Sequence, residues 1–361
     1  MHLRRTFDPT QVRLDRRRLL GAVGLAAGAA IGFAGEPALA SSSVDNNGVT
    51  VPPGKRGIQL FTVRDIVSRA PNPAAGIGGG FQYVFEQLAA IGYKEVEFAG
   101  YNQNTAILGR QITPAEIRQL LDDNGLAGNG SHIGFNFANP DAFEAQLDIA
   151  EILGLPYLGT ASIPTNSRYK ADWETAADNF NAFGTRAAAR CIGLYQHNHH
   201  AEYNFLLDAG PPDANGRPTR SSGLRALEYF FTLVDPQLVY FEMDIYWGYV
   251  AQHRYQSYVD ADGVVQPSIF DPLPVVAAAP ERFPLFHVKD GVPAATADGY
   301  TFVPVGRGVL PLHEFLATVG KKGYHHPNYE QDNAPGNPTT APHQSLESAR
   351  FSYSTIAGWR G

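Results

Sequence analysis

Residues 238–289 show most clearly the strand–helix–strand pattern that this chain repeats. The stretch LVYFEMD (238–244) is an apolar run that ends in an acid, and LFHVK (285–289) is a second apolar run with polar residues at its end. Both runs have the branched and aromatic residues typical of strands, and the weaker helical stretch 272–279 lies between them. A strand, a crossover helix and a second strand are the unit of a parallel sheet.

Similar units extend in both directions from this one. We expect strands at 57–63, 95–98, 130–133, 157–160, 191–197, 238–244, 285–289 and 328–330, and helices at 81–91, 113–121, 139–153, 172–190, 224–234, 272–279, 312–321 and 345–358. Eight strand–helix units over roughly 300 residues predict an α/β fold, a single-domain (β/α)8 TIM barrel. A doubly wound open sheet is the alternative, but the chain has neither G-x-G-x-x-G after its first strand nor a P-loop sequence.

Local signals support single elements of this scheme. Thr113, Pro114 and Glu116 form the pattern of a capping box at a helix start. The chain has one cysteine, which excludes an internal disulfide framework and any site built from several cysteines. That cysteine, Cys191, begins the fifth expected strand, so we expect a small buried core residue.

Composition narrows the class of protein. The 361 residues include 28 Lys and Arg against 35 Asp and Glu, for a formal net charge of −7, and 44% are hydrophobic. This hydrophobic fraction is that of a folded globular chain. Proteins that bind nucleic acid derive much of their affinity from clustered Lys and Arg, so the acidic balance argues against that class.

The first forty residues have the layout of an export signal. Arg16, Arg17 and Arg18 precede two leucines and a Gly/Ala-rich apolar stretch, and Ala38-Leu39-Ala40 has the form of a cleavage site. The pattern resembles a bacterial twin-arginine signal. We therefore expect a signal peptide at 1–40, a linker at 41–55, a barrel at 56–361, and a periplasmic or secreted protein. A membrane anchor is the alternative, although the stretch is short and rich in glycine.

Polar residues gather where the expected strands end, which is where barrels place their chemistry. Asp244, His287 and Glu330 end three successive strands, and their nitrogen and oxygen atoms suit one divalent ion such as Mn, Co, Zn or Mg. Taken singly, these residues could instead be a helix cap, a core histidine and a surface carboxylate. Together they predict a metal site, with a fourth ligand from the fifth strand.

Other strand-end residues suggest the rest of the site. The fifth strand runs into His197, which we expect to be the fourth ligand, and then into His199 and Glu202, which we place at the substrate. The alternative for this histidine-rich run is an adventitious surface metal site. Lys289 is a candidate cation beside a developing oxyanion, or a partner of Asp290. Further candidate substrate contacts are Glu97, His132 and Trp247.

These segments together resemble the xylose isomerase-like TIM-barrel family, also called sugar phosphate isomerases/epimerases. The matching stretches are GIQLFTVRD (57–65), GYKEVE (92–97), SHIG (131–134), YQHNH (195–199), FEMDIYW (241–247), FHVKD (286–290) and EQD (330–332). The resemblance implies a divalent metal held by residues that end strands five to eight. Here those residues are His197, Asp244, His287 and Glu330, although many family members have Glu at the strand-five position.

The resemblance also implies a reaction. We expect a metal-dependent isomerase or epimerase that acts on a sugar or a sugar-derived ketone through an enediolate, with Glu330 and Glu202 as candidate bases. Export argues against a phosphorylated substrate. The alternatives are a lyase that cleaves 3-keto-glycosides by β-elimination and a secreted sugar-binding protein without catalysis. A phosphodiesterase like endonuclease IV is disfavoured by the acidic balance and by export.

The expected partner is a small carbohydrate, with no nucleic acid and no membrane once the signal is cleaved. The sequence leaves open whether the chain forms a homo-oligomer. The loops at 208–223 and 249–270 are longer than a simple barrel needs, and we expect them to form a lid or a partner surface.

Overall fold

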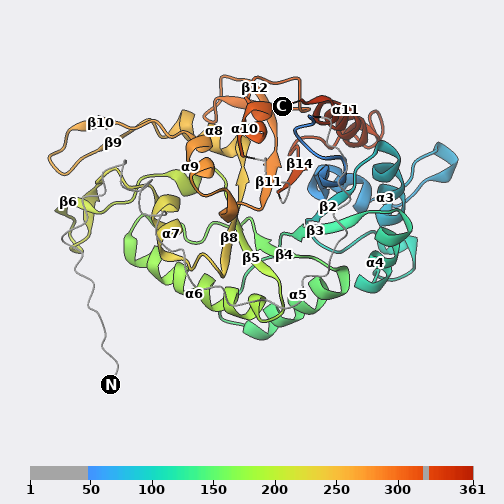
Figure 1. Cartoon of the computed structure of the whole chain (residues 1–361), viewed down its shortest axis with the longest axis horizontal. Coiled ribbons are helices and arrows are strands. Elements are labelled where there is room, and N and C mark those ends of the chain that lie inside the picture. Colours follow the sequence, from blue (N-terminus) through green and yellow to red (C-terminus); the bar gives the residue numbers. More distant parts are fainter. Residues whose placement is uncertain (1–47, 320–324, 361) are drawn as a thin grey trace. The chain divides into compact units, whose positions relative to one another are not determined.

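An eight-stranded parallel sheet forms the centre of the fold in this computed structural model, which describes residues 48–319 and 325–360. The sheet order is β3-β2-β1-β14-β11-β8-β5-β4. The two end strands meet where the backbone N–H of Ile133 donates to the carbonyl of Gly159 at 2.8 Å, which closes the barrel (Figure 1). The strands are β1 (Gly57–Gln59), β2 (Glu95–Phe98), β3 (Ala127–Ser131), β4 (Tyr157–Thr160), β5 (Gly193–His197), β8 (Val239–Asp244), β11 (Leu285–Val288) and β14 (His326–Tyr329).

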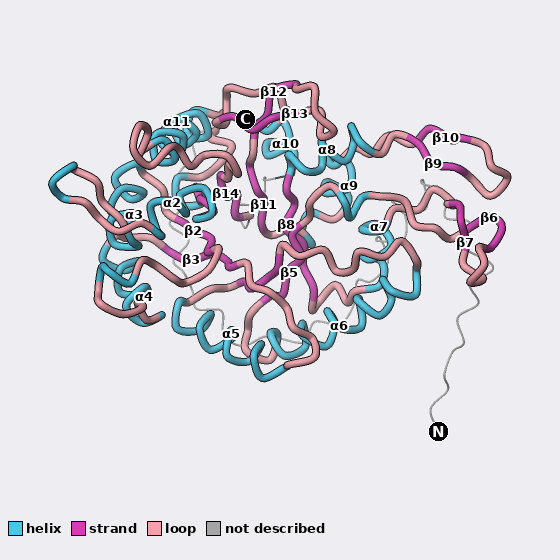
Figure 2. The backbone as a smooth tube through the Cα atoms, turned by 180° about the vertical axis from the view of Figure 1, so that it is seen from behind, coloured by secondary structure: helices cyan, strands magenta, loops and turns pink. Residues whose placement is uncertain are grey.

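Helices follow the strands and lie outside them, as Figure 2 shows, so the predicted TIM barrel is confirmed. They are α2 (Arg64–Ser68), α3 (Gly80–Ile91), α4 (Pro114–Asp123), α5 (Pro140–Leu153), α6 (Lys170–Ala188), α7 (Ala226–Leu233), α8 (Ile245–Arg254), α9 (Pro272–Ala278), α10 (Leu312–Val319) and α11 (Gln344–Gly358). The capping box of α4 is present, because Thr113 Oγ1 accepts from Glu116 N–H and the Glu116 carboxylate accepts from Thr113 N–H.

The predicted signal peptide at 1–40 lies outside the described residues, as does the linker up to residue 47. Within the described ranges, no helix has both the length and the apolar character needed to cross a membrane.

Two local predictions were wrong. The first strand ends at Gln59 rather than at 63, because the Gln59 side chain accepts from the backbone N–H of Phe61 and starts a 3-10 turn over Leu60–Val63. Cys191 is exposed rather than buried. It occupies the left-handed turn after α6 with a φ of 58°, where the N–H of Ile192 donates back to the carbonyl of Ala187 at 3.0 Å.

The interior of the barrel is polar at its lower end, where β14 begins with His326. His326 Nδ1 lies 2.7 Å from Glu95 Oε2, and Asn129 donates to Asn328 at 2.8 Å. Glu95 and Glu97 alternate along β2, so both face the interior, whereas Val96 faces the surrounding helices and is fully buried. The polar column inside the barrel therefore continues from Glu95 upward to Glu97.

The two long loops form hairpins that extend beside each other from one side of the barrel (Figure 1). The first contains β6 (Ala209–Pro212) and β7 (Pro218–Arg220), and the second contains β9 (Ser257–Val259) and β10 (Val265–Pro267). The N–H of Ser221 donates to the carbonyl of Val259 at 3.0 Å and joins the two. We call these two hairpins the arm. Its role as a lid or partner surface stays a prediction.

A third hairpin, β12 (Asp290–Pro293) with β13 (Tyr300–Val303), follows the seventh barrel strand. Asp290 fixes the turn after this hairpin, because its carboxylate accepts from the N–H groups of Gly306 and Gly308 at 2.9 and 3.0 Å. A Cβ on Gly308 would lie 2.0 Å from Asp290 Oδ1, so this position requires glycine.

Candidate metal centre

The predicted ligands meet at the upper ends of neighbouring strands. The β8–β11 register pairs Asp244 with His287, and β14 ends one residue before Glu330. Asp244 and His287 are fully buried, and Glu330 is 5% exposed. The parallel sheet thus brings together residues that lie up to 86 positions apart in the sequence.

The ligand atoms are close enough to share one ion. Asp244, His287 and Glu330 each offer an atom within 4.8 Å of the other two. His287 Nδ1 lies 2.7 Å from Glu330 Oε2 and 3.8 Å from Asp244 Oδ2, and His197 Nε2 lies 3.8 Å from the same Asp244 oxygen. We call these four residues the metal cluster.

Both histidines of the cluster are oriented by carboxylates on their far side. His287 Nε2 lies 2.7 Å from Glu97 Oε2, and His197 Nδ1 lies 3.0 Å from Glu242 Oε2. Each ring donates its far-side N–H to a carboxylate, which leaves the Nε2 of the neutral His197 with a free lone pair. Burial opposes charge on His287, but Glu242, Glu330 and Glu97 outweigh it and raise the His287 pKa well above its usual value, so a bound ion would replace the proton on His287 Nδ1. Metal-binding histidines in proteins have this arrangement.

The atoms that face the cluster fit a cation. Asp244 Oδ2 and His287 Nδ1 are buried beside charged groups of the site: Lys289 Nζ lies 3.0 Å from Asp244 Oδ2, and Glu330 Oε2 lies 2.7 Å from His287 Nδ1. Neither contact has the geometry of a hydrogen bond among the described residues, and buried polar atoms normally have one, so these two atoms point to a ligand. Three carboxylates, from Asp244, Glu330 and Asp332, surround the single ammonium of Lys289, which leaves negative charge for a divalent ion to compensate. The residues present therefore fit a divalent metal.

A second group of potential ligands shares the same two histidines. It consists of His132, His197, Glu242 and His287 and lies on the Glu97 side of the rings. Here the nitrogens have carboxylate partners, including His132 Nε2 at 2.7 Å from Glu242 Oε2. Because these atoms already pair with one another, the group supports the metal cluster from below and is the weaker candidate for an ion.

Electrostatics divide these groups into charged and neutral members. Burial opposes charge on His132, but Glu97 and Glu242 outweigh it and raise the His132 pKa to about 9. Burial, together with His287 and His199, lowers the pKa of His197 well below its usual value. A neutral His197 is the form that binds a metal, and a charged His132 balances the carboxylates beneath it.

Asp244 combines two roles that its sequence position left open. Its Oδ1 accepts from the backbone N–H of Trp247 at 2.9 Å and caps α8, while Oδ2 faces the cluster. Asn198 holds the Asp244 backbone through two hydrogen bonds, one in each direction. The cap and the amide clamp fix the carboxylate in place, so the residue is both a helix cap and a candidate ligand.

The ammonium group of Lys289 lies beside two carboxylates of the metal cluster, those of Asp244 and Glu330. Its Nζ is 2.7 Å from Glu330 Oε2, 3.0 Å from Asp244 Oδ2 and 2.8 Å from Asp332 Oδ1. Burial opposes the charge, but these carboxylates raise the pKa of Lys289 well above its usual value. Lys289 therefore pairs with the cluster and not with Asp290, the alternative that the sequence suggested.

Glu202, His199 and Trp247 lie beside the cluster. The rings of His197 and His199 are 4.8 Å apart, and those of His199 and Trp247 are 5.4 Å apart. Glu202 Oε2 accepts from the backbone N–H of His199 at 3.1 Å, whereas its Oε1 is buried without a hydrogen-bond partner. Burial raises the pKa of Glu202 to about 7.

All ten residues expected at the site thus lie at the same end of the barrel. Glu97 is fully buried and contacts His287, Tyr195 and His132, so its position favours support of the histidines over the substrate contact that we expected. Sequence reasoning missed Glu242, although its place two residues before Asp244 puts it on the same strand face. It also missed Tyr195 and Asp332, which carry no comparable signal.

Comparison with known proteins agrees with this geometry. The profile of the xylose isomerase-like TIM barrel family matches residues 85–351. The chain belongs to this family. No curated protein matches the chain.

Solved structures share the fold of this xylose isomerase-like barrel at low sequence identity. A sugar phosphate isomerase/epimerase from Parabacteroides distasonis is 20% identical with a TM-score of 0.61, over 84% of this chain and 96% of that one. An L-ribulose 3-epimerase is 11% identical with a TM-score of 0.53, over 83% and 92%. A probable 3-DHS dehydratase from Bacillus anthracis is 12% identical with a TM-score of 0.54, over 83% and 98%.

Proposed function

We propose that the chain is a divalent-metal-dependent enzyme that isomerises or epimerises a sugar or a sugar-derived ketone. One observation carries this proposal: the ligand atoms of Asp244, His287 and Glu330 lie within 4.8 Å of one another in the same barrel end as Glu202, whose Oε1 has no hydrogen-bond partner among the described residues. A metal next to a carboxylate that can move a proton is the equipment for proton transfer beside a carbonyl. The isomerase and epimerase structures that share the fold are consistent with it.

The four cluster residues would hold the ion through His197 Nε2, Asp244 Oδ2, His287 Nδ1 and Glu330 Oε2. When bound, a divalent ion supplies Lewis-acid polarisation of a substrate carbonyl. Glu97 and Glu242 accept the far-side N–H of His287 and His197 and so orient His287 Nδ1 and His197 Nε2 toward this position.

Glu202 is the group that we assign to proton transfer. Its free Oε1 is buried, and its other oxygen is fixed by the backbone N–H of His199. A pKa of about 7 lets the carboxylate accept a proton and return it near neutral pH. Glu330, the other candidate base, is held ionised because Lys289 and His287 overcome the effect of burial and lower its pKa well below the usual value. Its position favours the role of ligand.

His199 and Trp247 complete this end of the barrel. Burial and the charge of Lys289 lower the pKa of His199 to about 4, so the ring is neutral and can exchange hydrogen bonds with a substrate hydroxyl. The indole N–H of Trp247 is buried and has no hydrogen-bond partner in the described part of the chain. An unpaired donor beside a partly exposed aromatic ring suits a polyhydroxylated ligand.

Two variants test the assignment. In D2O with Mn²⁺ and either a free ketose or a 3-keto-glucoside, proton NMR follows exchange of the C–H next to the carbonyl. Glu202→Gln should slow exchange about 100- to 10,000-fold while keeping its metal, because only the proton acceptor is lost. Glu330→Gln should lose metal as well as exchange. Full exchange in Glu202→Gln would overturn the role of Glu202.

The same experiment separates the alternatives that share this site. An epimer or isomer of the ketose supports the proposal, and release of the free aglycone or sugar from the 3-keto-glucoside identifies β-elimination instead. Saturable binding of sugars without exchange in the metal-loaded chain would identify a binding protein. Either β-elimination or sugar binding without exchange would overturn the proposed reaction.

The N-terminal pattern supports a proposal on location. We infer that residues 1–40 direct export by the twin-arginine route to the periplasm or beyond. Replacing both Arg16 and Arg17 with lysine should retain the protein in the cytoplasm, as followed by fractionation, and unchanged export would contradict the inference.

A further inference from the structure

A cavity of about 530 Å³ lies at the base of the arm, outside the metal cluster. Its walls come from the segment before β6, from β7, and from the chain between the end of α8 and β9. None of the metal cluster residues lines it. Tyr255 lines the cavity, and its hydroxyl lies 3.1 Å from Nδ1 of His200. The volume falls within the range of small-molecule sites.

The cavity is lined by cationic side chains and by no acidic ones. Arg168, Arg220, Arg254 and His253 come from three separate segments, and the lining includes no Asp or Glu. Arg254 is paired with Asp298 at 2.6 Å. Arg168 and Arg220 have no carboxylate of the described residues within ion-pair distance. Two uncompensated guanidinium groups in one cavity are unexpected in a chain of net charge −7.

Both unpaired arginines are anchored while most of each guanidinium stays available. Arg168 Nε donates to the carbonyl of Phe205 at 2.9 Å, and Arg220 Nη1 donates to the carbonyl of Ala261 at 2.7 Å. Each guanidinium has five N–H donors, so one anchor fixes the group and leaves the remaining donors for a ligand. Anchoring in advance lowers the entropy that a bound anion would otherwise cost.

Aromatic and hydroxyl groups complete the lining. The rings of Phe205 and Tyr258 lie 5.0 Å apart, and Ser257 and Thr219 add hydroxyls. An apolar ring surface beside arginines suits a ligand that has both a carbon skeleton and an oxyanion group.

We propose that this cavity is a second binding site, for a small molecule that bears a carboxylate, sulfate or phosphate group. Arg168 and Arg220 would bind the oxyanion through paired N–H groups, and Tyr258, whose ring packs beside the buried Phe205, would contact the rest of the ligand. The site is independent of the proposed reaction, since it shares no residue with the metal cluster.

Calorimetry on the full chain at constant ionic strength tests this site with three probes: D-glucuronate, inorganic phosphate and D-glucose. Saturable binding of glucuronate or phosphate, but not of glucose, is expected. Tighter binding of glucuronate identifies an organic anion as the ligand class, and tighter binding of phosphate identifies a free inorganic anion. Absence of saturable binding by both anions, or equal binding of glucose, would overturn the proposal.

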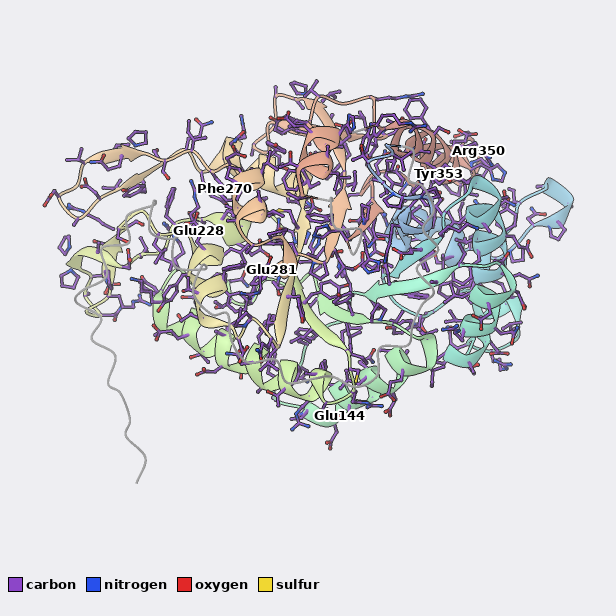
Figure 3. All side chains as sticks on the ribbon, viewed as in Figure 1. Glu144, Glu228, Phe270, Glu281, Arg350 and Tyr353 are labelled. Atoms are coloured by element: carbon purple, nitrogen blue, oxygen red, sulfur yellow. The ribbon has the colours of Figure 1, made fainter. Side chains whose placement is uncertain are left out.

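Variants locate the binding. Arg168→Gln/Arg220→Gln should weaken anion binding at least about tenfold, the effect of losing charged hydrogen bonds. Each single variant is measured beside the double one, so a folding defect in the pair does not remove the test. Arg186→Gln removes the same charge from α6, where Arg186 pairs with Glu144 on the outer helices (Figure 3), and should change nothing. Asp244→Asn should also retain binding. Equal losses in Arg186→Gln, or loss in Asp244→Asn, would place the anion elsewhere.

Discussion

Glu97→Gln is the substitution that isolates the support beneath the metal cluster. The Glu97 carboxylate accepts from three donors: His287 Nε2 at 2.7 Å, Asn328 Nδ2 at 3.1 Å and the Tyr195 hydroxyl. His132 Nε2, which is hydrogen-bonded to Glu242, lies 3.1 Å from Glu97 Oε1. A glutamine amide has one oxygen and one NH2 group, so in either orientation its NH2 faces donors. His287 then loses the carboxylate that fixes its tautomer and ring orientation.

The expected loss is in metal affinity. Removing such a supporting partner costs about 10- to 100-fold in affinity, or roughly 1.4 to 2.8 kcal/mol. Titration calorimetry of Mn²⁺ into the chelator-treated chain measures it directly.

Glu95→Gln is the matched control. Glu95 lies two residues earlier on the same strand, is also buried, and also pairs with a histidine, His326. It contacts no member of the metal cluster. Both variants should lose stability, but only Glu97→Gln should lose metal affinity. Equal Mn²⁺ affinity in Glu97→Gln and the wild-type chain, or an equal loss in both variants, would refute the role of Glu97.

One pH profile and two further substitutions test separate parts of the account. Because burial raises the pKa of Glu202 to about 7 and only the ionised form accepts a proton, kcat/KM should rise as the pH rises through about 7; an acid limb near pH 4 would contradict this. Lys289→Met leaves three carboxylates without their ammonium, so the metal-free chain should lose about 3–5 kcal/mol of stability. Mn²⁺ should restore much of this stability, as measured by Tm. A Tm of the variant that does not depend on Mn²⁺ would contradict this charge balance. Cys191 has a left-handed backbone conformation, which costs a non-glycine residue about 1–2 kcal/mol. Cys191→Gly removes this cost but adds entropy to the unfolded chain, so the free energy of unfolding measured with urea should rise by up to about 1 kcal/mol. A lower free energy of unfolding would contradict the strain at Cys191.

The barrel itself was predictable because its signals are local. Apolar runs such as Leu285–Val288, and the capping box at Thr113, report on strands and helices without reference to the rest of the chain. Cys191 shows where this fails. A residue at the end of a helix can either begin the next strand or reverse the chain, and composition does not separate the two.

The grouping of the candidate ligands was predictable from the sequence, but the residues that support them were not. Asp244, His287 and Glu330 lie at or next to the ends of apolar runs, so the sequence alone identifies them as strand-end groups. Glu97 and Tyr195 act through contacts 98 residues apart in sequence, which only the closed barrel brings together. The anchored arginines of the cavity, Arg168 before α6 and Arg220 in the arm, were not predictable, because their anchoring carbonyls lie in segments that only the folded chain brings beside them.

Metal content tests the central claim most directly. Elemental analysis of the purified chain, beside Asp244→Asn and the Arg186→Gln control, counts the bound ions. We predict about one divalent ion per chain in the wild type and in the control, and a loss in Asp244→Asn. A wild-type chain that binds no ion when supplied with Mn, Co, Zn or Mg, or one that keeps its ion in Asp244→Asn, would contradict the account.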